Sequence, residues 1–163
     1  GYAMAAILGT EEVMQAAQST FVSSTNWTER IGPTAALATL KKYQETQTDK
    51  HIISIGNKTQ QIWRDAALKA SLQVDVTGLP TLSAFGFKSD KSMELNTRFS
   101  IEMLQRGFLG FRQFKPSLAH GDAELNKYKN AVEDVFLLLS KLPNDEIISS
   151  PVAHTGLHRL TKE

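Results

Sequence analysis

Apolar side chains repeat at helical spacing in the last third of the chain, and this pattern constrains the fold more than any other feature. The positions are Leu125, Tyr128, Val132, Val135 and Leu139. They lie on one face of an α-helix that begins near Asp122, has two acidic residues in its first turn and is closed by Lys141 and Pro143. Such a helix has to bury its apolar face against another element. We therefore expect a packed core, which 163 residues are enough to form.

A second long helix is predicted between residues 52 and 70. Its apolar and small positions are Ile52, Ile55, Thr59, Ile62, Ala66 and Ala70, and it runs through Gly56. Three weaker helices are expected: a short one capped by Thr10, one that begins near Gly32 and Pro33, and one from Asn96 to Arg106 that ends at Gly107. Residues 45–49 are polar and should link two helices.

Four segments have the character of strands. Val74 and Val76 alternate with polar residues, and a turn at residues 78–80 should join them in a hairpin to residues 81–87. Residues 108–114 are apolar and aromatic, and residues 4–8 form a short apolar run that resembles a buried strand. The order of elements predicts an α+β fold with a small antiparallel sheet covered by helices on one face.

Composition excludes several classes of function. The formal net charge is +1, and basic residues form no stripe, so neither nucleic acid nor a membrane surface is an expected partner. No apolar run reaches the length of a membrane span. The chain has no cysteine, which rules out disulfides, thiol catalysis and cysteine-bound zinc and suits a reducing, cytoplasmic location. Residues 144–163 are polar and should form a loosely packed tail.

The histidines and carboxylates form no convincing site. His154 and His158 are four apart, but the residues between them are poor helix formers and no glutamate follows His154, so no metal site is predicted. His51 falls on the polar side of its helix and should be solvated. His120 precedes the last helix, where it either caps or packs, or lines a site. The acidic residues Glu29, Asp65, Asp75 and Glu94 are scattered.

One polar segment carries a chemical hypothesis. Small hydroxyl side chains gather in residues 23–28, immediately before the helix expected near Pro33. A loop of this kind presents hydroxyl and backbone N–H groups together, which suits a phosphate. The alternative is a polar turn with a helix cap, and the pattern alone leaves both open.

The run at residues 21–40, FVSSTNWTERIGPTAALATL, resembles class III aminotransferases of the pyridoxal-phosphate (PLP)-dependent, fold-type I group, and in particular the glutamate-1-semialdehyde aminomutase-like branch. Residues 1–9 resemble the stretch after the Schiff-base lysine of that family. Residues 78–80, 107–108 and 117–120 resemble parts of its C-terminal domain, although Gly121 replaces the threonine expected after His120. The resemblance covers essentially the whole chain in the same order.

The resemblance implies specific roles. Enzymes of this family are homodimers with the cofactor at the interface, and they move an amino group through a pyridoxamine form. A threonine reaches across the dimer to the cofactor phosphate, and alignment on residues 38–40 gives that role to Thr25, with Ser24 beside it. The family has small residues where this chain has Trp27, Glu29 and Arg30, which makes these three candidate substrate contacts.

The resemblance also implies a division of the chain. Residues 1–48 correspond to a remnant strand and helices of the large cofactor domain, residues 49–143 to the C-terminal domain and residues 144–163 to a tail. The family's catalytic lysine lies before Gly1, so the isolated chain is expected to be inactive and without PLP. The rival interpretation is a non-catalytic α+β binding or oligomerisation module derived from such an enzyme.

Two further pairs of basic residues are candidates for chemistry. Lys88 and Lys115 end apolar strands and are the least solvated lysines expected, yet nothing marks either one as a Schiff-base lysine, which needs a desolvated pocket. Arg30 and Arg112 could pair with a substrate carboxylate, because arginine binds carboxylates in a bidentate manner.

Overall fold

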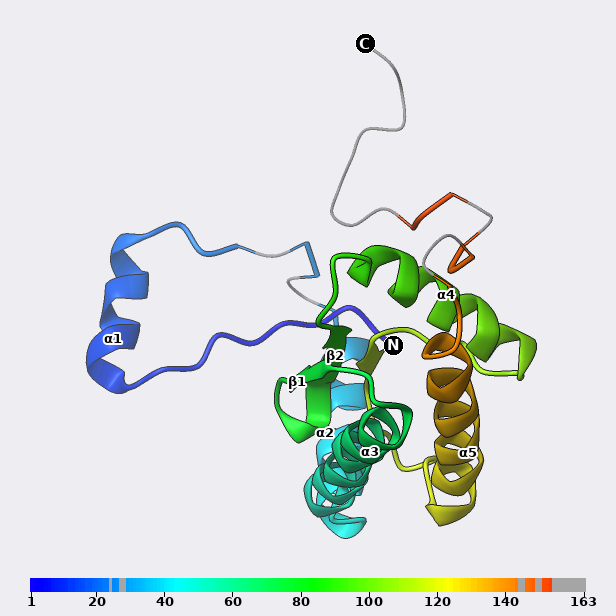
Figure 1. The fold of residues 1–163 in the computed structure, drawn as a ribbon. Coiled ribbons are helices and arrows are strands. Elements are labelled where there is room, and N and C mark those ends of the chain that lie inside the picture. Colours follow the sequence, from blue (N-terminus) through cyan, green and yellow to red (C-terminus); the bar gives the residue numbers. More distant parts are fainter. Residues whose placement is uncertain (24, 27–28, 144–145, 149–150, 154–163) are drawn as a thin grey trace. The chain divides into compact units, whose positions relative to one another are not determined.

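The computed structural model describes residues 1–23, 25–26, 29–143, 146–148 and 151–153 (Figure 1). The chain divides into two compact units, Gly1–Thr48 and Asp49–Glu163.

The second unit is an α+β fold built on a three-stranded antiparallel sheet. Its strands are β1 (Val74–Thr77), β2 (Ser83–Phe87) and β3 (Gln113–Phe114), in the order β1-β2-β3. A short 3₁₀ turn, η2 (Pro80–Leu82), joins β1 to β2. The helices are α3 (Thr48–Ala70), α4 (Ser92–Gln105) and α5 (Asp122–Leu139). The predicted fold class, the hairpin and the two long helices are confirmed.

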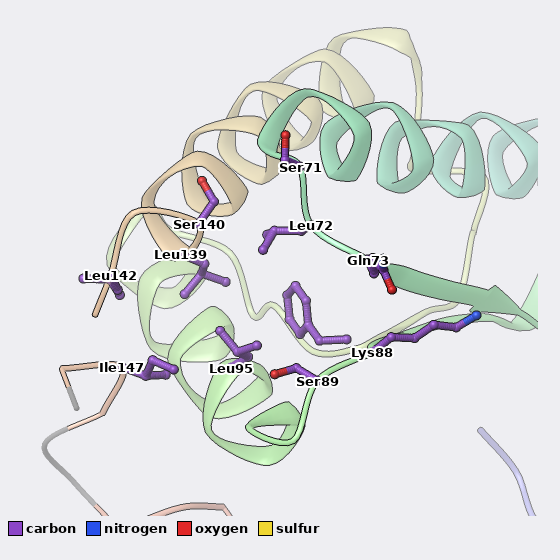
Figure 2. Close-up of a pocket in the computed structure, with 11 residues that line it drawn as sticks. Ser71, Leu72, Gln73, Lys88, Ser89, Leu95, Leu139, Ser140, Leu142 and Ile147 are labelled. Carbon is purple, nitrogen blue, oxygen red and sulfur yellow. The ribbon is translucent and has the colours of Figure 1, made fainter. Parts of the chain in front are cut away.

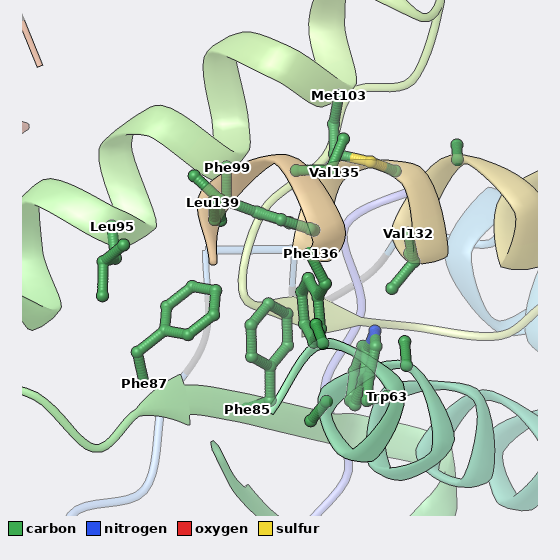
Figure 3. Packing of buried hydrophobic residues seen from close by; sticks show 14 of the residues in the cluster. Trp63, Phe85, Phe87, Leu95, Phe99, Met103, Val132, Val135, Phe136 and Leu139 are labelled. Carbon is green, nitrogen blue, oxygen red and sulfur yellow. The ribbon is translucent and has the colours of Figure 1, made fainter. Parts of the chain in front are cut away.

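The core of this unit is aromatic and lies on one face of β2. Side chains of β2 alternate between buried and half-buried, as a strand with one covered face requires. Phe85 and Phe87 point from that face toward the helices, where they meet Trp63, Phe99 and Phe136 (Figure 3). These rings belong to α3, α4 and α5, so the core joins all three helices to the sheet.

A glycine allows α3 to touch the turn that follows β1. A Cβ atom at Gly56 would lie 1.8 Å from the carbonyl oxygen of Pro80, so no larger residue fits there. One turn further along α3, the Gln60 amide donates to the carbonyl of Gly78 at 3.1 Å and to the hydroxyl of Ser83 at 3.0 Å. The helix thereby fixes the hairpin turn.

The start of α4 was predicted wrongly. The helix begins at Ser92, four residues before Asn96, which lies inside it. The earlier start places Leu95 on the buried face with Phe99 and Met103, at a spacing of four residues. The predicted end is confirmed, because Gly107 adopts a φ of +82° and the Phe108 N–H donates to the Met103 carbonyl at 2.9 Å.

The strand expected over residues 108–114 is much shorter. Only Gln113 and Phe114 pair with β2, opposite Ala84 and Ser83. The backbone N–H of Phe108 bonds to the last turn of α4, and Leu109 is almost fully exposed. The first residues of the segment therefore follow the end of the helix and are not part of the sheet. Residues before Gln113 therefore form a loop.

The described part of the tail is better packed than expected. Ile147 is 4% exposed and belongs to the core cluster. Its carbonyl lies 3.5 Å from Nη1 of Arg98, and the Ala153 N–H donates to Oγ1 of Thr97 at 3.0 Å. The apolar side chain of Ile147 explains why a mostly polar segment packs on α4.

The first unit contains α1 (Glu11–Gln15), a 3₁₀ turn η1 (Ala16–Ser19) and α2 (Ile31–Glu45). Thr46 and Gln47 separate α2 from α3, and Gln47 has a φ of +48°. The strand predicted over residues 4–8 is absent: Ile7 and Leu8 are exposed, and no strand pairs with this segment among the described residues. A strand needs a neighbour for its backbone hydrogen bonds.

Gly56→Ala tests the contact between α3 and the turn. Helix propensity alone would make this change stabilising by about 1 kcal/mol. We expect destabilisation by about 2 kcal/mol or more, because the new methyl group overlaps a backbone oxygen. The measurement is denaturant unfolding. Gly86→Ala is the matched control, since nothing lies within 4 Å of its added Cβ, and equal stability of the two variants would contradict the contact.

Candidate functional site

The predicted phosphate loop lies at the start of α2. Thr25 and Asn26 line a cavity of about 570 Å³ together with Glu29, Pro33 and residues 3–5. Thr25 is exposed, so its hydroxyl is accessible. Ser24 and Trp27 lie outside the described residues, and their proposed contacts stay predictions.

Glu29 forms the cap of α2. Its carboxylate accepts hydrogen bonds from the backbone N–H groups of Ile31, at 2.5 Å, and Gly32, at 2.8 Å. These are among the first N–H groups of the helix, which have no partner within the helix and favour an anion. Glu29 supplies that anion from within the chain. Its predicted substrate contact stays untested.

Arg30 lies beside this cap with an exposed side chain. Its carbonyl accepts from the Thr34 N–H at 3.1 Å and from the Thr34 hydroxyl at 2.8 Å. The backbone of Arg30 is therefore used in starting α2, whereas its guanidinium projects from the described surface. A role for that guanidinium toward a substrate carboxylate stays a prediction.

Of the groups around the cavity, the side chain of Thr25 suits a phosphate, whereas the N–H groups at the start of α2 do not while Glu29 occupies them. The Thr25 hydroxyl can donate to a phosphate oxygen, and the cavity has room for the group. The N–H groups of Ile31 and Gly32 are already engaged by Glu29, so they do not form a phosphate site while this cap is in place. A phosphate contact through the side chain of Thr25 stays a prediction.

Neither lysine singled out in the sequence is desolvated. The side chain of Lys88 is 56% exposed and its ammonium lies 3.3 Å from a carboxylate oxygen of Asp75. Lys115 is also exposed. The expectation that they are the least solvated lysines was wrong, because both residues lie just beyond the strand ends, where the side chains turn toward water. Arg112 is exposed as well, with its guanidinium 5.7 Å from the ring centre of Phe111.

Two histidines take structural positions. Nε2 of His51 lies 3.0 Å from the carbonyl oxygen of His120, so His51 is half-buried and bonded, contrary to the solvated position expected. The ring of His120 packs on Phe114 at 5.0 Å, and its Nδ1 accepts from the Ser117 N–H at 2.9 Å. His154 and His158 lie outside the described residues, and the described part of the chain has no cluster of metal-binding side chains.

A buried charge cluster on α4 was missed by the sequence analysis. Glu102 is 5% exposed, and its two carboxylate oxygens accept from Nε of Arg98 and Nη1 of Arg106, each at 2.8 Å. Burial raises the pKa of Glu102, but the hydrogen bonds from Arg106 and Arg98 and their charges outweigh burial and hold the pKa below its usual value. The spacing of four residues between the three side chains is the signal that could have revealed it.

A second cavity of about 300 Å³ lies at the ends of α3 and α5 (Figure 2). The side chains of Leu72, Leu95 and Leu139 point into it, whereas the ammonium of Lys88 points away. Leucines form only part of its wall, which also includes the polar residues Ser71, Gln73, Ser89 and Ser140. No helix in the described ranges is long and apolar enough to cross a membrane.

Glu102→Gln tests the charge cluster. The folded-state pKa is lowered, so the ionised carboxylate stabilises the fold above the ordinary pKa of 4.5, and this contribution is lost as the pH falls through the lower folded value. We expect the variant to lose about 2 kcal/mol at pH 7 and the difference from the native chain to shrink below pH 4.5. Unfolding curves at several pH values measure this. Glu45→Gln, at an exposed ion pair, should change little.

Glu29→Ala tests the cap of α2. Loss of the carboxylate frees the N–H groups of Ile31 and Gly32, so their amide hydrogens should exchange faster with solvent and the first turn should fray, at a cost of about 1 kcal/mol. Hydrogen exchange followed by NMR gives both readouts. Glu45→Ala, at the other end of the same helix, is the control. Unchanged exchange at Gly32 would show that the cap does not form in solution.

No known protein family and no curated protein matches the chain by sequence. Its fold is similar to that of the FumI protein of Sphingopyxis sp. MTA144, solved in its PLP internal aldimine form, with a TM-score of 0.72 and 19% sequence identity. The match covers 86% of this chain and 36% of that protein. The chain therefore has the fold of a part of a PLP-dependent protein and spans little more than a third of its length.

Proposed function

We propose that this chain is part of a PLP-dependent aminotransferase or aminomutase of the class III, fold-type I group, close to the glutamate-1-semialdehyde aminomutase-like branch. The observation that carries the proposal is the fold match over 86% of the chain to a protein solved with PLP. The resemblance of residues 21–40 to class III sequences supports the finer assignment. The absence of cysteine suits a cytoplasmic enzyme.

The exposed apolar surface of the first unit supports the view that it acts within a larger assembly. Gly32 alone is buried among the described residues of this unit. Leu37, Leu40 and Ile31 of α2 are each more than half exposed. A helix with such a stripe gains stability by burying it. Further polypeptide of the parent enzyme and a second subunit of a homodimer are the partners that we propose to cover it.

In this proposal the loop before α2 holds the cofactor by its phosphate. The hydroxyl of Thr25 donates to a phosphate oxygen, with Ser24 beside it, and the Glu29 cap fixes the direction in which the loop leaves the helix. Trp27, Glu29 and Arg30 lie near the substrate. When bound, the cofactor supplies the electron sink for amino-group chemistry, and the protein contributes binding and orientation.

The isolated chain is proposed to be inactive, because the reactive lysine of the family corresponds to a position before Gly1. The two described lysines that were candidates for this role, Lys88 and Lys115, are exposed, whereas a Schiff-base lysine needs a desolvated pocket. A non-catalytic binding or oligomerisation module is the second candidate. The observation in its favour is that Asp49–Glu163 has its own aromatic core.

Thr25→Ala in the full-length parent tests the phosphate contact. A hydrogen bond to a charged group contributes about 1.5 kcal/mol or more, so we expect PLP to dissociate at least about tenfold more readily. The measurement is cofactor titration followed by absorbance. Thr25→Ser keeps the hydroxyl and should retain the cofactor. Equal PLP affinity in the alanine and serine variants would remove Thr25 from the site.

A further inference from the structure

A third cavity, of about 300 Å³, lies within the second unit between the loop after α4 and the start of α5. It is lined by Phe108, Leu109, Gly110, Phe111, Gln113, Phe114, Lys115, His120 and Tyr128. Its volume is at the lower end of the range found for small-molecule sites. None of these residues belongs to the loop before α2.

Aromatic rings form its walls. The ring of Phe114 lies 5.6 Å from that of Tyr128 and 5.0 Å from that of His120, and Phe108 lies 5.8 Å from Tyr128. These are ordinary distances for tilted and edge-on ring pairs. A planar ring placed among them would meet further aromatic edges and faces, which favours an aromatic ligand.

The polar groups of the cavity are mainly donors. Nδ1 of His120 accepts from the Ser117 N–H, so the neutral ring carries its proton on Nε2 and can donate from there. Lys115 adds an ammonium group, and Arg112 lies next to Phe111 on the same loop. No carboxylate lies among the lining residues. Such a set complements an anion.

The sequence around the cavity also contains more basic than acidic residues. No aspartate or glutamate occurs from Met103 to Gly121, whereas Arg112 and Lys115 lie there; Arg106 also lies there but is paired with Glu102. No ion pair within the described ranges involves Arg112 or Lys115. Phe111 is 52% exposed and Leu109 is 96% exposed, so the cavity has an apolar rim that is open to solvent.

We infer that this cavity binds a small aromatic carboxylate, with the ring packed against Phe108, Phe114 and Tyr128 from the cavity side and the carboxylate at the Lys115 end. The inference stands on residues of the second unit alone and does not depend on the proposed cofactor site. Its failure and that of the PLP proposal are therefore distinguishable.

The experiment is an NMR titration of the full chain with benzoate. We expect saturable amide shifts at Gly110, Phe114 and His120, with a dissociation constant on the order of 1 mM. Benzylamine, which has the opposite charge, and benzyl alcohol, which has none, are matched probes of similar shape. Both should bind several-fold more weakly. Absence of saturable shifts at the cavity, or equal binding of benzylamine, would overturn the inference.

Two substitutions test which lysine interacts with the carboxylate of the ligand. Lys115→Gln should weaken benzoate binding several-fold and leave benzyl alcohol unchanged, because only the charged ligand uses the ammonium group. Lys88→Gln is the matched control: this lysine is also exposed at a strand end but pairs with Asp75 outside the cavity. Both positions are on the surface, so both variants should fold. Equal effects of the two changes would also overturn the inference.

Discussion

Four aromatic rings surround Phe85, and the arrangement of the second unit follows from their contacts. Trp63 lies 4.9 Å from Phe85, Phe99 5.1 Å, Phe87 5.5 Å and Phe136 5.6 Å between ring centres. Phe85 is on the middle strand, and three of its neighbours come from three different helices (Figure 3). One side chain therefore joins the sheet to α3, α4 and α5. Each such pair contributes about 0.5–1.5 kcal/mol beyond the burial of its surface.

The polar groups of Trp63 and Tyr128, at the edge of this core, form a hydrogen bond with each other. Nε1 of Trp63 donates to the hydroxyl of Tyr128 at 2.9 Å, which links α3 to α5. Burial raises the pKa of Tyr128 well above its usual value, so the phenol stays neutral. The outer side of the same ring contacts Phe108 and Phe114. Tyr128 thus belongs both to the core and to the wall of the third cavity.

Regular periodicity made much of the second unit predictable. The helices α3 and α5 were predicted because their apolar side chains repeat over about five turns. The hairpin was predicted from a turn that contains glycine and proline. Asn96 misled the prediction of α4, because it resembles a cap, whereas the true first residues carry no side-chain cap. Residues 108–114 fit a buried strand by composition, but Phe108 bonds locally to the end of α4, and pairing with β2 begins only at Gln113, a tertiary contact that no local pattern reveals.

The candidate site was predictable only in outline. The hydroxyl-rich loop does precede a helix, and Thr25 does line a cavity. That the carboxylate of Glu29 would occupy the helix N-terminus could not be read from spacing, because a residue just before a helix can equally turn toward solvent. For His120 the sequence left two alternatives open, packing or lining a site. It does both, since its ring packs against Phe114 at a tilt and borders a cavity.

The two residues between α2 and α3 have a mechanical consequence. Gln47 adopts a left-handed backbone conformation, and the hydroxyls of Thr46 and Thr48 lie 2.7 Å apart across it. A helix of 15 residues such as α2 is about 22 Å long. If it pivots at this joint by about 10°, its far end, which carries the loop with Thr25, sweeps through about 4 Å. The joint is thus a lever that turns a small torsional change into a displacement of several ångströms at the loop before α2.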